Sequence, residues 1–116
     1  MLSCVYQESL GNGLAHVRWA GQHLFVPEEV PKPFDKVAIH PRHVYISPYP
    51  PPGPQVNRFQ GRIKRIRHDR GVAHLEVVVE DQCVYSQMTT QQAQSLSLSA
   101  EDCVYGILKL RALHAC

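Results

Sequence analysis

The chain has 116 residues, of which 44% are hydrophobic, and its formal net charge at pH 7 is +2. This length suits one domain or two small subdomains, and such a chain buries roughly two-thirds of its unfolded surface on folding. A net charge this small says little about whether the partner is a nucleic acid, a membrane or another protein. No window approaches about eighteen apolar residues, and the N-terminus lacks the regions of a signal peptide, so we expect no insertion into a membrane.

The four cysteines, Cys4, Cys83, Cys103 and Cys116, show no CxxC spacing and no regular framework. We interpret them as reduced thiols of a cytosolic protein, because disulfides are rare in that compartment. Cys4 and Cys103 lie among apolar residues, where a thiol usually acts as a small hydrophobic side chain.

Short strands are expected in the first half of the chain at residues 4–9, 14–19, 23–26, 36–39 and 43–47. The segment 10–13 contains Gly-Asn-Gly and predicts a hairpin turn, because these residues accept a positive φ. Pro27–Phe34 holds three prolines and is expected to be a loop. Pro41 cannot donate a ladder hydrogen bond and marks a turn or an edge between the last two strands.

The proline-rich segment 48–56 is the clearest boundary, since such a run favours extended polyproline II and forms a stiff connector. It divides the chain into N-terminal strands at 1–47 and a barrel half at 57–116. Further strands are expected at residues 57–67, 71–80, 82–87 and 103–109. This succession of short strands predicts an all-β fold, a small OB-like β-barrel with one short helix.

The one helix is expected to begin at 88–90, where a threonine can cap the exposed N–H groups. A glutamine three positions later completes a capping box. Ala93 and Leu96 are expected to face the barrel, because they lie three residues apart.

Half of the lysines and arginines fall within residues 58–70, at Arg58, Arg62, Lys64, Arg65, Arg67 and Arg70. Strict alternation from Arg62 to Arg67 leaves neither face of a strand apolar, so the run predicts a bulge or a strand at a rim. A basic barrel face can bind single-stranded nucleic acid, but no aromatic residues interleave with these charges. We therefore expect a solvated or partner-facing strand.

The pair His40 and His43 has a spacing that serves zinc when both lie on a helix. Pro41 argues instead for strand and turn, where the two imidazoles splay apart, and we interpret both as surface histidines. The chain also lacks the phosphate-binding loop GxxxxGK[ST] and the motifs GxSxG and HExxH. We therefore expect neither catalysis nor a cofactor.

Lys109 lies between apolar residues near the end of the last expected strand. Its charge can reach solvent along the apolar stem, or it can be the fixed charge of an anion site. A site for a tetrahedral oxyanion needs many donors, one or two positive charges and no carboxylates. Thr89 and Thr90 offer hydroxyl and N–H groups at the start of the helix.

Four segments occur in an order that resembles a known family. Residues 6–27 resemble the hairpin that follows the ATPase domain of a transporter, and 37–47 resemble the strand segment before its barrel closes. Asn57–Gly61 resembles the asparagine-x-leucine-x-glycine opening of a Mop unit, and Val104–Lys109 resembles its closing lysine strand. Together they resemble the C-terminal TOBE/Mop-like region of ATP-binding subunits from molybdate- or sulfate-type ABC importers.

This resemblance implies a regulatory module that senses molybdate, tungstate or sulfate and forms a homodimer. It also implies partners, the ATPase and membrane subunits of the transporter, and a cytoplasmic location at the membrane. The anion-binding residues implied are Lys109, Thr89, Thr90, Asn57 and Arg58.

Two alternatives remain open. Pro54–Asn57 stands where the family often has Ser-Ala-Arg-Asn, so the same module without a ligand site would serve dimerisation and packing. An oligonucleotide-binding barrel that uses the basic run 62–67 is the other alternative.

Overall fold

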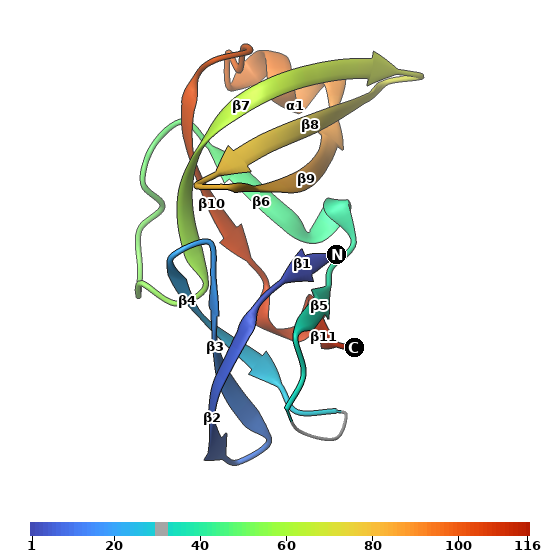
Figure 1. Ribbon diagram of the computed structural model, residues 1–116. Helices are drawn as coiled ribbons and strands as arrows, with labels where there is room; N and C mark the ends of the chain where they lie inside the picture. Colours follow the sequence, from blue (N-terminus) through green and yellow to red (C-terminus); the bar gives the residue numbers. More distant parts are fainter. Residues whose placement is uncertain (30–32) are drawn as a thin grey trace.

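The computed structural model describes residues 1–29 and 33–116 and forms two β-rich lobes, one above the other in Figure 1. The strands of the upper lobe are β6 (Val44–Ser47), β7 (Arg58–Asp69), β8 (Val72–Val79), β9 (Gln82–Thr89) and β10 (Cys103–Leu108). Those of the lower lobe are β1 (Leu2–Ser3), β2 (Val5–Gly11), β3 (Leu14–Trp19), β4 (Gln22–Pro27), β5 (Lys36–Ala38) and β11 (His114–Ala115). The helical elements are α1 (Thr90–Ser95) and two 3₁₀ turns, η1 (Pro41–His43) and η2 (Leu110–Ala112).

The five upper strands form one antiparallel sheet in the order β6-β10-β7-β8-β9. The sheet curls until its two edge strands meet, and the buried Ser86 hydroxyl on β9 donates to the Val44 carbonyl on β6 at 2.6 Å. Among the described residues, β6 and β9 form no backbone ladder, so this side-chain hydrogen bond is what joins the two edges. The predicted fold class, an all-β barrel with one short helix, is confirmed.

Strand β7 contains the predicted bulge. Ile63 pairs with Val77 and Arg65 pairs with Glu76, so the register shifts at the residue between them. An extra residue in one strand resets the alternation of its side chains. Ile63 is therefore fully buried while Ile66, three positions later, packs against the same core. The bulge explains how so basic a strand still presents an apolar face.

The lower lobe consists of the expected meander β2-β3-β4 and a small sheet β1-β5-β11. Side chains on β3 and β4 alternate between core and surface, and Trp19 at the end of β3 is fully buried. Its ring meets Phe59 of β7 edge-to-face, with centroids 5.7 Å apart, and its indole N–H donates to the Gln82 side chain at 3.0 Å. Trp19 thus ties the lower lobe to two strands of the upper one.

Helix α1 begins as the sequence predicts. Thr89 is the N-cap, and it exchanges hydrogen bonds with Gln92 in a complete capping box. Ala93 is buried, whereas Leu96 lies at the C-cap and is half-buried. Among the described residues, no helix has the length and apolar character needed to cross a membrane.

The two segments on either side of the connector, 1–47 and 57–116, each contribute a strand to the other's lobe. β6 comes from the N-terminal 47 residues but pairs with β10, and β11 at the end of the chain pairs with β5 in the lower lobe. The connector 48–56 contains no strand or helix, and the Arg58 guanidinium donates to its Pro51 and Pro52 carbonyls. The division 1–47, 48–56 and 57–116 stays a prediction.

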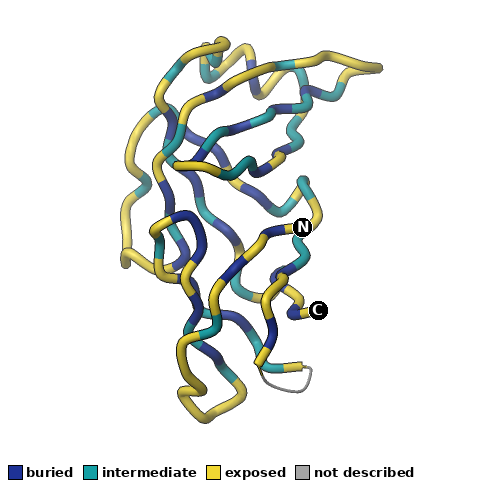
Figure 2. The backbone as a smooth tube through the Cα atoms, in the orientation of Figure 1, coloured by how far each residue is buried: buried dark blue, intermediate teal, exposed yellow. Residues whose placement is uncertain are grey.

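Burial follows the inward faces of both lobes, and exposure concentrates at the β2–β3 and β7–β8 hairpins (Figure 2). Part of the predicted loop Pro27–Phe34, residues 30–32, lies outside the described residues. The described residues beside them, 28–29 and 33–35, contain no helix or strand.

Candidate anion-binding site

A hollow opens where β10 ends and the chain turns into η2. It has two parts, of about 560 Å³ and about 400 Å³, and Arg42 and Lys109 line both. The larger part is bounded by β6 and by the side of α1, with Gln87, Gln91, Gln92 and Ser95 as polar lining. The smaller part is lined by His40, Arg42, His43, Lys109, Arg111, Ala112 and His114. We call the two parts together the cationic hollow.

Local structure places the two shared cations. Arg42 is the middle residue of η1, and Pro41 before it begins the turn with a preset φ. The His40 ring accepts a hydrogen bond from the Arg42 backbone N–H at 3.1 Å through Nδ1, and so caps the turn. Lys109 is the N-cap of η2 at the end of β10, and the Lys109 side chain makes no capping hydrogen bond.

The charge in the cationic hollow is of one sign. Among residues 1–29 and 33–116, three permanent cations line it, Arg42, Lys109 and Arg111, and no aspartate or glutamate does. Partial burial, followed by Arg42, Lys109 and His40, lowers the pKa of His43 below its usual 6.5. The depressed pKa is the response expected of an imidazole held among cations.

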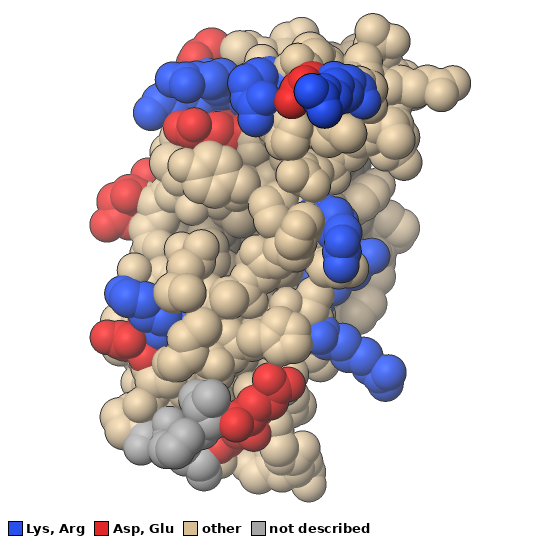
Figure 3. Space-filling view, turned by 90° about the vertical axis from the view of Figure 1, so that its right-hand side faces the viewer, with Lys and Arg blue, Asp and Glu red and all other residues tan. Residues whose placement is uncertain are grey.

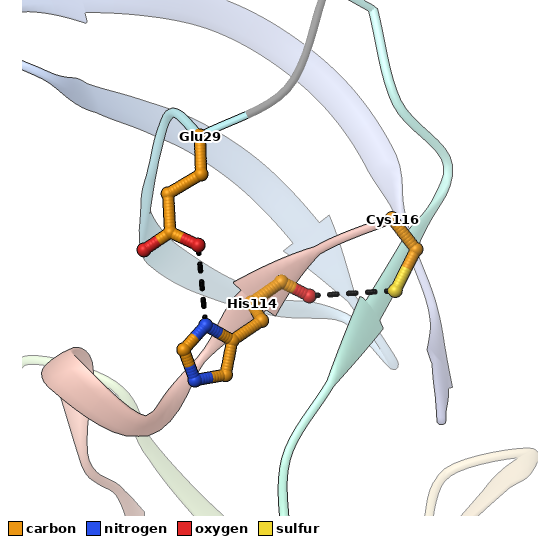
Figure 4. Close-up of polar contacts among 3 residues, drawn as sticks. All are labelled: Glu29, His114 and Cys116. Atoms are coloured by element: carbon orange, nitrogen blue, oxygen red, sulfur yellow. Dashed lines mark hydrogen bonds and ion pairs between the residues drawn. The ribbon is translucent and has the colours of Figure 1, made fainter.

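A carboxylate meets this group at one place. The Glu29 carboxylate accepts a hydrogen bond from His114 Nδ1 at 3.2 Å. Figure 4 shows the carboxylate and the imidazole facing each other. The Cys116 thiol in the same view lies toward the His114 carbonyl, away from the ring. His114 therefore has a counter-charge that the lysine and arginines of the hollow lack among the described residues.

The interpretation of His40 and His43 as splayed apart is wrong. The two rings lie with centroids 6.4 Å apart at an interplanar angle of 73°. The reason is that His40 caps the single 3₁₀ turn formed by residues 41–43, and side chains three apart lie on the same side of so tight a turn. Within the described part of the chain, no group of three or more His, Cys, Asp or Glu is arranged to hold a metal ion.

Of the five predicted anion-binding residues, Lys109 lines the cationic hollow. Lys109 is exposed, and its ammonium has no hydrogen bond or ion pair with any described residue. The ammonium is therefore free to meet a ligand, and Lys109 directly follows Leu108, the last residue of β10.

The groups of Thr89 and Thr90 are already used within the protein. The Thr89 hydroxyl accepts from the Gln92 N–H, and the Thr89 N–H donates to the Gln92 side chain. The Thr90 N–H donates to the Gly71 carbonyl, and its hydroxyl lies 3.2 Å from the His68 ring. The side of α1 reaches the hollow instead through Gln91, Gln92 and Ser95.

Asn57 and Arg58 are also engaged elsewhere. Both amide atoms of the buried Asn57 bind the Phe25 backbone, and two nitrogens of Arg58 bind the proline-rich connector. The structure thus does not bring the five predicted residues to one place. Their role in anion binding stays a prediction.

Sequence reasoning missed Arg42 as a site residue. Its neighbour in space, Lys109, lies far along the chain, and the two meet because β6, which follows η1, pairs with β10. A signal was present in the His-Pro-Arg-His run, where a proline starts a turn directly before a cation. That signal is local, however, and does not reveal the partner.

A second cationic region, distinct from the hollow, lies on β7 and consists of Arg62, Lys64, Arg65 and Arg67. We call it the basic rim of β7. Figure 3 shows Lys and Arg side chains in a row along the upper edge, with Asp and Glu among them, and a further group below. The ion pairs of the rim are Arg62–Glu101, Lys64–Glu76 and Arg67–Asp69. These carboxylates offset much of the charge that a nucleic-acid backbone would need.

The curled five-stranded sheet, its single helix and the second small lobe define a Mop-like β fold. No protein-family model matches the chain, and no curated protein matches it in sequence. Among solved structures, the chain is similar to the cytoplasmic molybdate-binding protein ModG in a crystal form with molybdate bound. The TM-score is 0.72 at 14% sequence identity, and the similarity covers 98% of this chain and 90% of the ModG chain.

Proposed function

We propose that this chain is a non-catalytic oxyanion-binding module, and that molybdate, tungstate or sulfate binds in the cationic hollow. The single observation that carries the proposal is the placement of Lys109 and Arg42 on one hollow, with no carboxylate among the described residues that line it. A tetrahedral dianion is a weakly basic acceptor, so it needs permanent positive charge and several N–H or O–H donors. Gln91, Gln92 and Ser95 are further donors within the same hollow.

The similarity to ModG supports this proposal at the level of the fold. ModG is a molybdate-binding protein, and its chain is covered almost completely by this one. One fold can carry many functions, so the site residues bear the argument for the ligand.

We further propose the setting that the sequence resemblance implies. In it, the module is the regulatory C-terminal region of an ABC importer ATPase subunit, located in the cytoplasm beside the membrane subunits. It forms a homodimer and restrains the ATPase when the cytosolic anion concentration is high. Such regulation requires the anion to bind the restrained state more tightly than the active state.

A second function has a specific observation in its favour. The side-chain oxygen of Thr89, the amide of Asn57 and two of the three guanidinium nitrogens of Arg58 are occupied by contacts within the protein, as expected of residues that stabilise a fold. A module without a ligand, serving only dimerisation and packing, accounts for those contacts equally well. Anion titration separates the two functions.

The test is calorimetric titration of the purified chain with molybdate, tungstate and sulfate, with the mass of the oligomer measured by light scattering. Binding of one of these anions with micromolar affinity is the expected result. Lys109→Gln and Arg42→Gln should each weaken it about tenfold, a loss of about 1.4 kcal/mol for one exposed charge-assisted contact.

Two matched controls keep the charge change but leave the hollow intact. Lys36→Gln lies on β5, and Arg70→Gln lies in the β7–β8 turn; neither residue lines the cationic hollow. If all four variants bind as the unmodified chain does, the site is elsewhere. Absence of heat up to millimolar anion, with a stable dimer, would establish the ligand-free module instead.

A further inference from the structure

Two histidines of the cationic hollow act as hydrogen-bond acceptors toward the same arginine. Arg42 donates its backbone N–H to His40 Nδ1 at 3.1 Å and its side-chain Nε–H to His43 Nε2 at 3.3 Å. An arginine has only donors, so each imidazole nitrogen in these contacts must carry a lone pair. In the free protein, the contact with Arg42 thus favours the neutral form of the His43 ring.

The anion competes with His43 for this arginine. The guanidinium of Arg42 lines both parts of the hollow, and it can bind an oxyanion through several N–H groups at once. Once the guanidinium turns to the anion, His43 Nε2 loses its donor. The same imidazole then lies beside a new double negative charge, which favours its protonated form.

We propose that the cationic hollow binds its dianion together with one proton, which His43 takes up from solvent at Nε2 when the anion displaces it from Arg42. This inference rests on the proposed function. The balance is simple: free protein, dianion and one proton give a complex in which His43 is an imidazolium and donates to the anion. No covalent bond other than N–H is formed, and the charge change at the site is one unit instead of two.

The other charged and titratable groups around His43 are less suited to take up the proton. Lys109 and Arg111 are permanent cations, His40 is tied to the backbone of η1, and His114 already faces Glu29. Strand β9, which packs against η1, carries a thiol and a phenol, Cys83 and Tyr85, and no carboxylate.

Beyond Pro41, the neighbouring surface is lined by Arg65, Arg67, His74 and Glu76. Glu76 forms an ion pair with Lys64 at 3.4 Å, so it is not an open counter-charge for His43.

The direction of the pH effect follows because loss of the Arg42 contact and the added dianion raise the pKa of His43 above its value in the free protein. Above the pKa of His43 in the complex, neither form carries the proton, and below its pKa in the free protein both do. Between these limits binding takes up a proton, and affinity rises as pH falls by up to about tenfold per pH unit for one fully linked proton.

The test uses sulfate, which remains a dianion across this pH range, so that any proton taken up enters the protein. Calorimetric titrations at pH 6, 7 and 8, in buffers of different ionisation enthalpy, give the number of protons bound with each anion. We expect affinity at pH 6 to exceed that at pH 8 at least threefold, with a buffer-dependent heat that corresponds to uptake of up to about one proton per anion.

The pH dependence of sulfate affinity in single variants shows which residue takes up the proton. His43→Gln, whose amide oxygen can still accept from Arg42, should reduce the ratio of the pH 6 and pH 8 affinities to about one. His23→Gln on β4, outside the hollow, should keep the ratio. Circular dichroism of each variant confirms that it folds, and Arg42→Lys, which lacks Nε–H, should likewise lose most of the pH dependence.

The outcomes separate the two proposals. Sulfate binding with no buffer-dependent heat, or uptake that disappears in His114→Gln and not in His43→Gln, overturns the assignment to His43 while the proposed function stands. Absence of sulfate, molybdate and tungstate binding at every pH overturns the proposed function and this inference with it.

Discussion

Asn57 holds the backbone of Phe25 through both atoms of its side-chain amide. Oδ1 accepts from the Phe25 N–H at 2.7 Å, and Nδ2 donates to the Phe25 carbonyl at 3.0 Å. The amide thus pairs with β4 as a neighbouring strand would, at the point where the chain enters β7. Asn57 is 2% exposed and has a φ of 53°, a conformation that asparagine tolerates better than most residues.

Asn57→Ala should therefore lower the free energy of unfolding by about 2–4 kcal/mol. The substitution leaves the Phe25 donor and acceptor without a partner and places a side chain less suited to positive φ. Urea unfolding followed by circular dichroism measures the loss. Asn57→Gly removes the same hydrogen bonds without the backbone strain, so it should cost less, and equal losses would contradict the strain contribution.

Gly106 on β10 lies directly opposite Phe59 on β7, whose ring covers it. A Cβ at Gly106 would stand 2.0 Å from Phe59 Cζ, so the buried ring would have to move. We expect Gly106→Ala to destabilise the protein by about 3 kcal/mol, the upper end for overpacking. The ring also contacts Trp19, so the change should appear in tryptophan fluorescence.

Phe59→Leu in the Gly106→Ala background tests this explanation. A shorter side chain frees the space above residue 106, so the double variant should lose less than the sum of the two single losses. Strict additivity would show that the ring is not what excludes the methyl group.

Thr89→Ala should lower stability by about 1 kcal/mol, because it removes the side-chain half of the capping box on α1. Thr90→Ala is the matched control, since the Thr90 hydroxyl contacts only the exposed His68 ring among the described residues. Thermal unfolding of both variants measures the difference. A larger effect at Thr90 would contradict the assignment of the cap.

Cys4 introduces a pH dependence at alkaline pH. Burial, with a smaller contribution from Asp35, raises the pKa of Cys4 from 9.0 to about 11. The unfolded chain then releases this proton before the folded one does. The contribution of Cys4 to stability is complete below pH 9 and is lost as pH rises toward 11.

Urea unfolding at pH 8 and pH 10 checks this, with Cys4→Ala as the reference for all other titrating groups. The unmodified protein should lose more stability between the two pH values than the variant does. Parallel losses would show that the thiol titrates alike in the folded and unfolded chain.

The basic rim of β7 should bind single-stranded oligonucleotides only weakly, with a Kd above about 100 µM at physiological salt. Its ion pairs with Glu76, Asp69 and Glu101 already offset three of its cations. Fluorescence anisotropy with a labelled oligonucleotide measures the affinity. Tight binding that weakens steeply with salt would revive the alternative of an oligonucleotide-binding barrel.

Much of the fold could be predicted from local patterns, because those patterns have local causes. Alternating burial on β3 and β8, the threonine cap of α1 and the turn glycines each depend on residues a few positions apart. The bulge near Lys64 was one of two geometries predicted for the basic strand, because strict alternation leaves neither of its faces apolar.

The site was less predictable because it depends on contacts between distant residues. Lys109 could be selected from its apolar neighbours, but the pairing of β6 with β10 decides that Arg42 joins it. Nothing near Asn57 in the sequence indicates that its amide is taken by Phe25, on a strand of the other lobe. The hydrogen bonds that occupy Thr89 and Thr90 likewise became visible only with the fold.

The exchange of strands between the two segments has a kinetic consequence. The sheet that contains Val44–Ser47 cannot be completed until Cys103–Leu108 is present, and the lower sheet waits for His114–Ala115. Loop closure over such separations is slow, and it disfavours stable intermediates made of one lobe alone. The two lobes should therefore fold together in one cooperative step, after the whole chain is available. A cut within the proline-rich connector should leave two fragments that fold only when they are mixed.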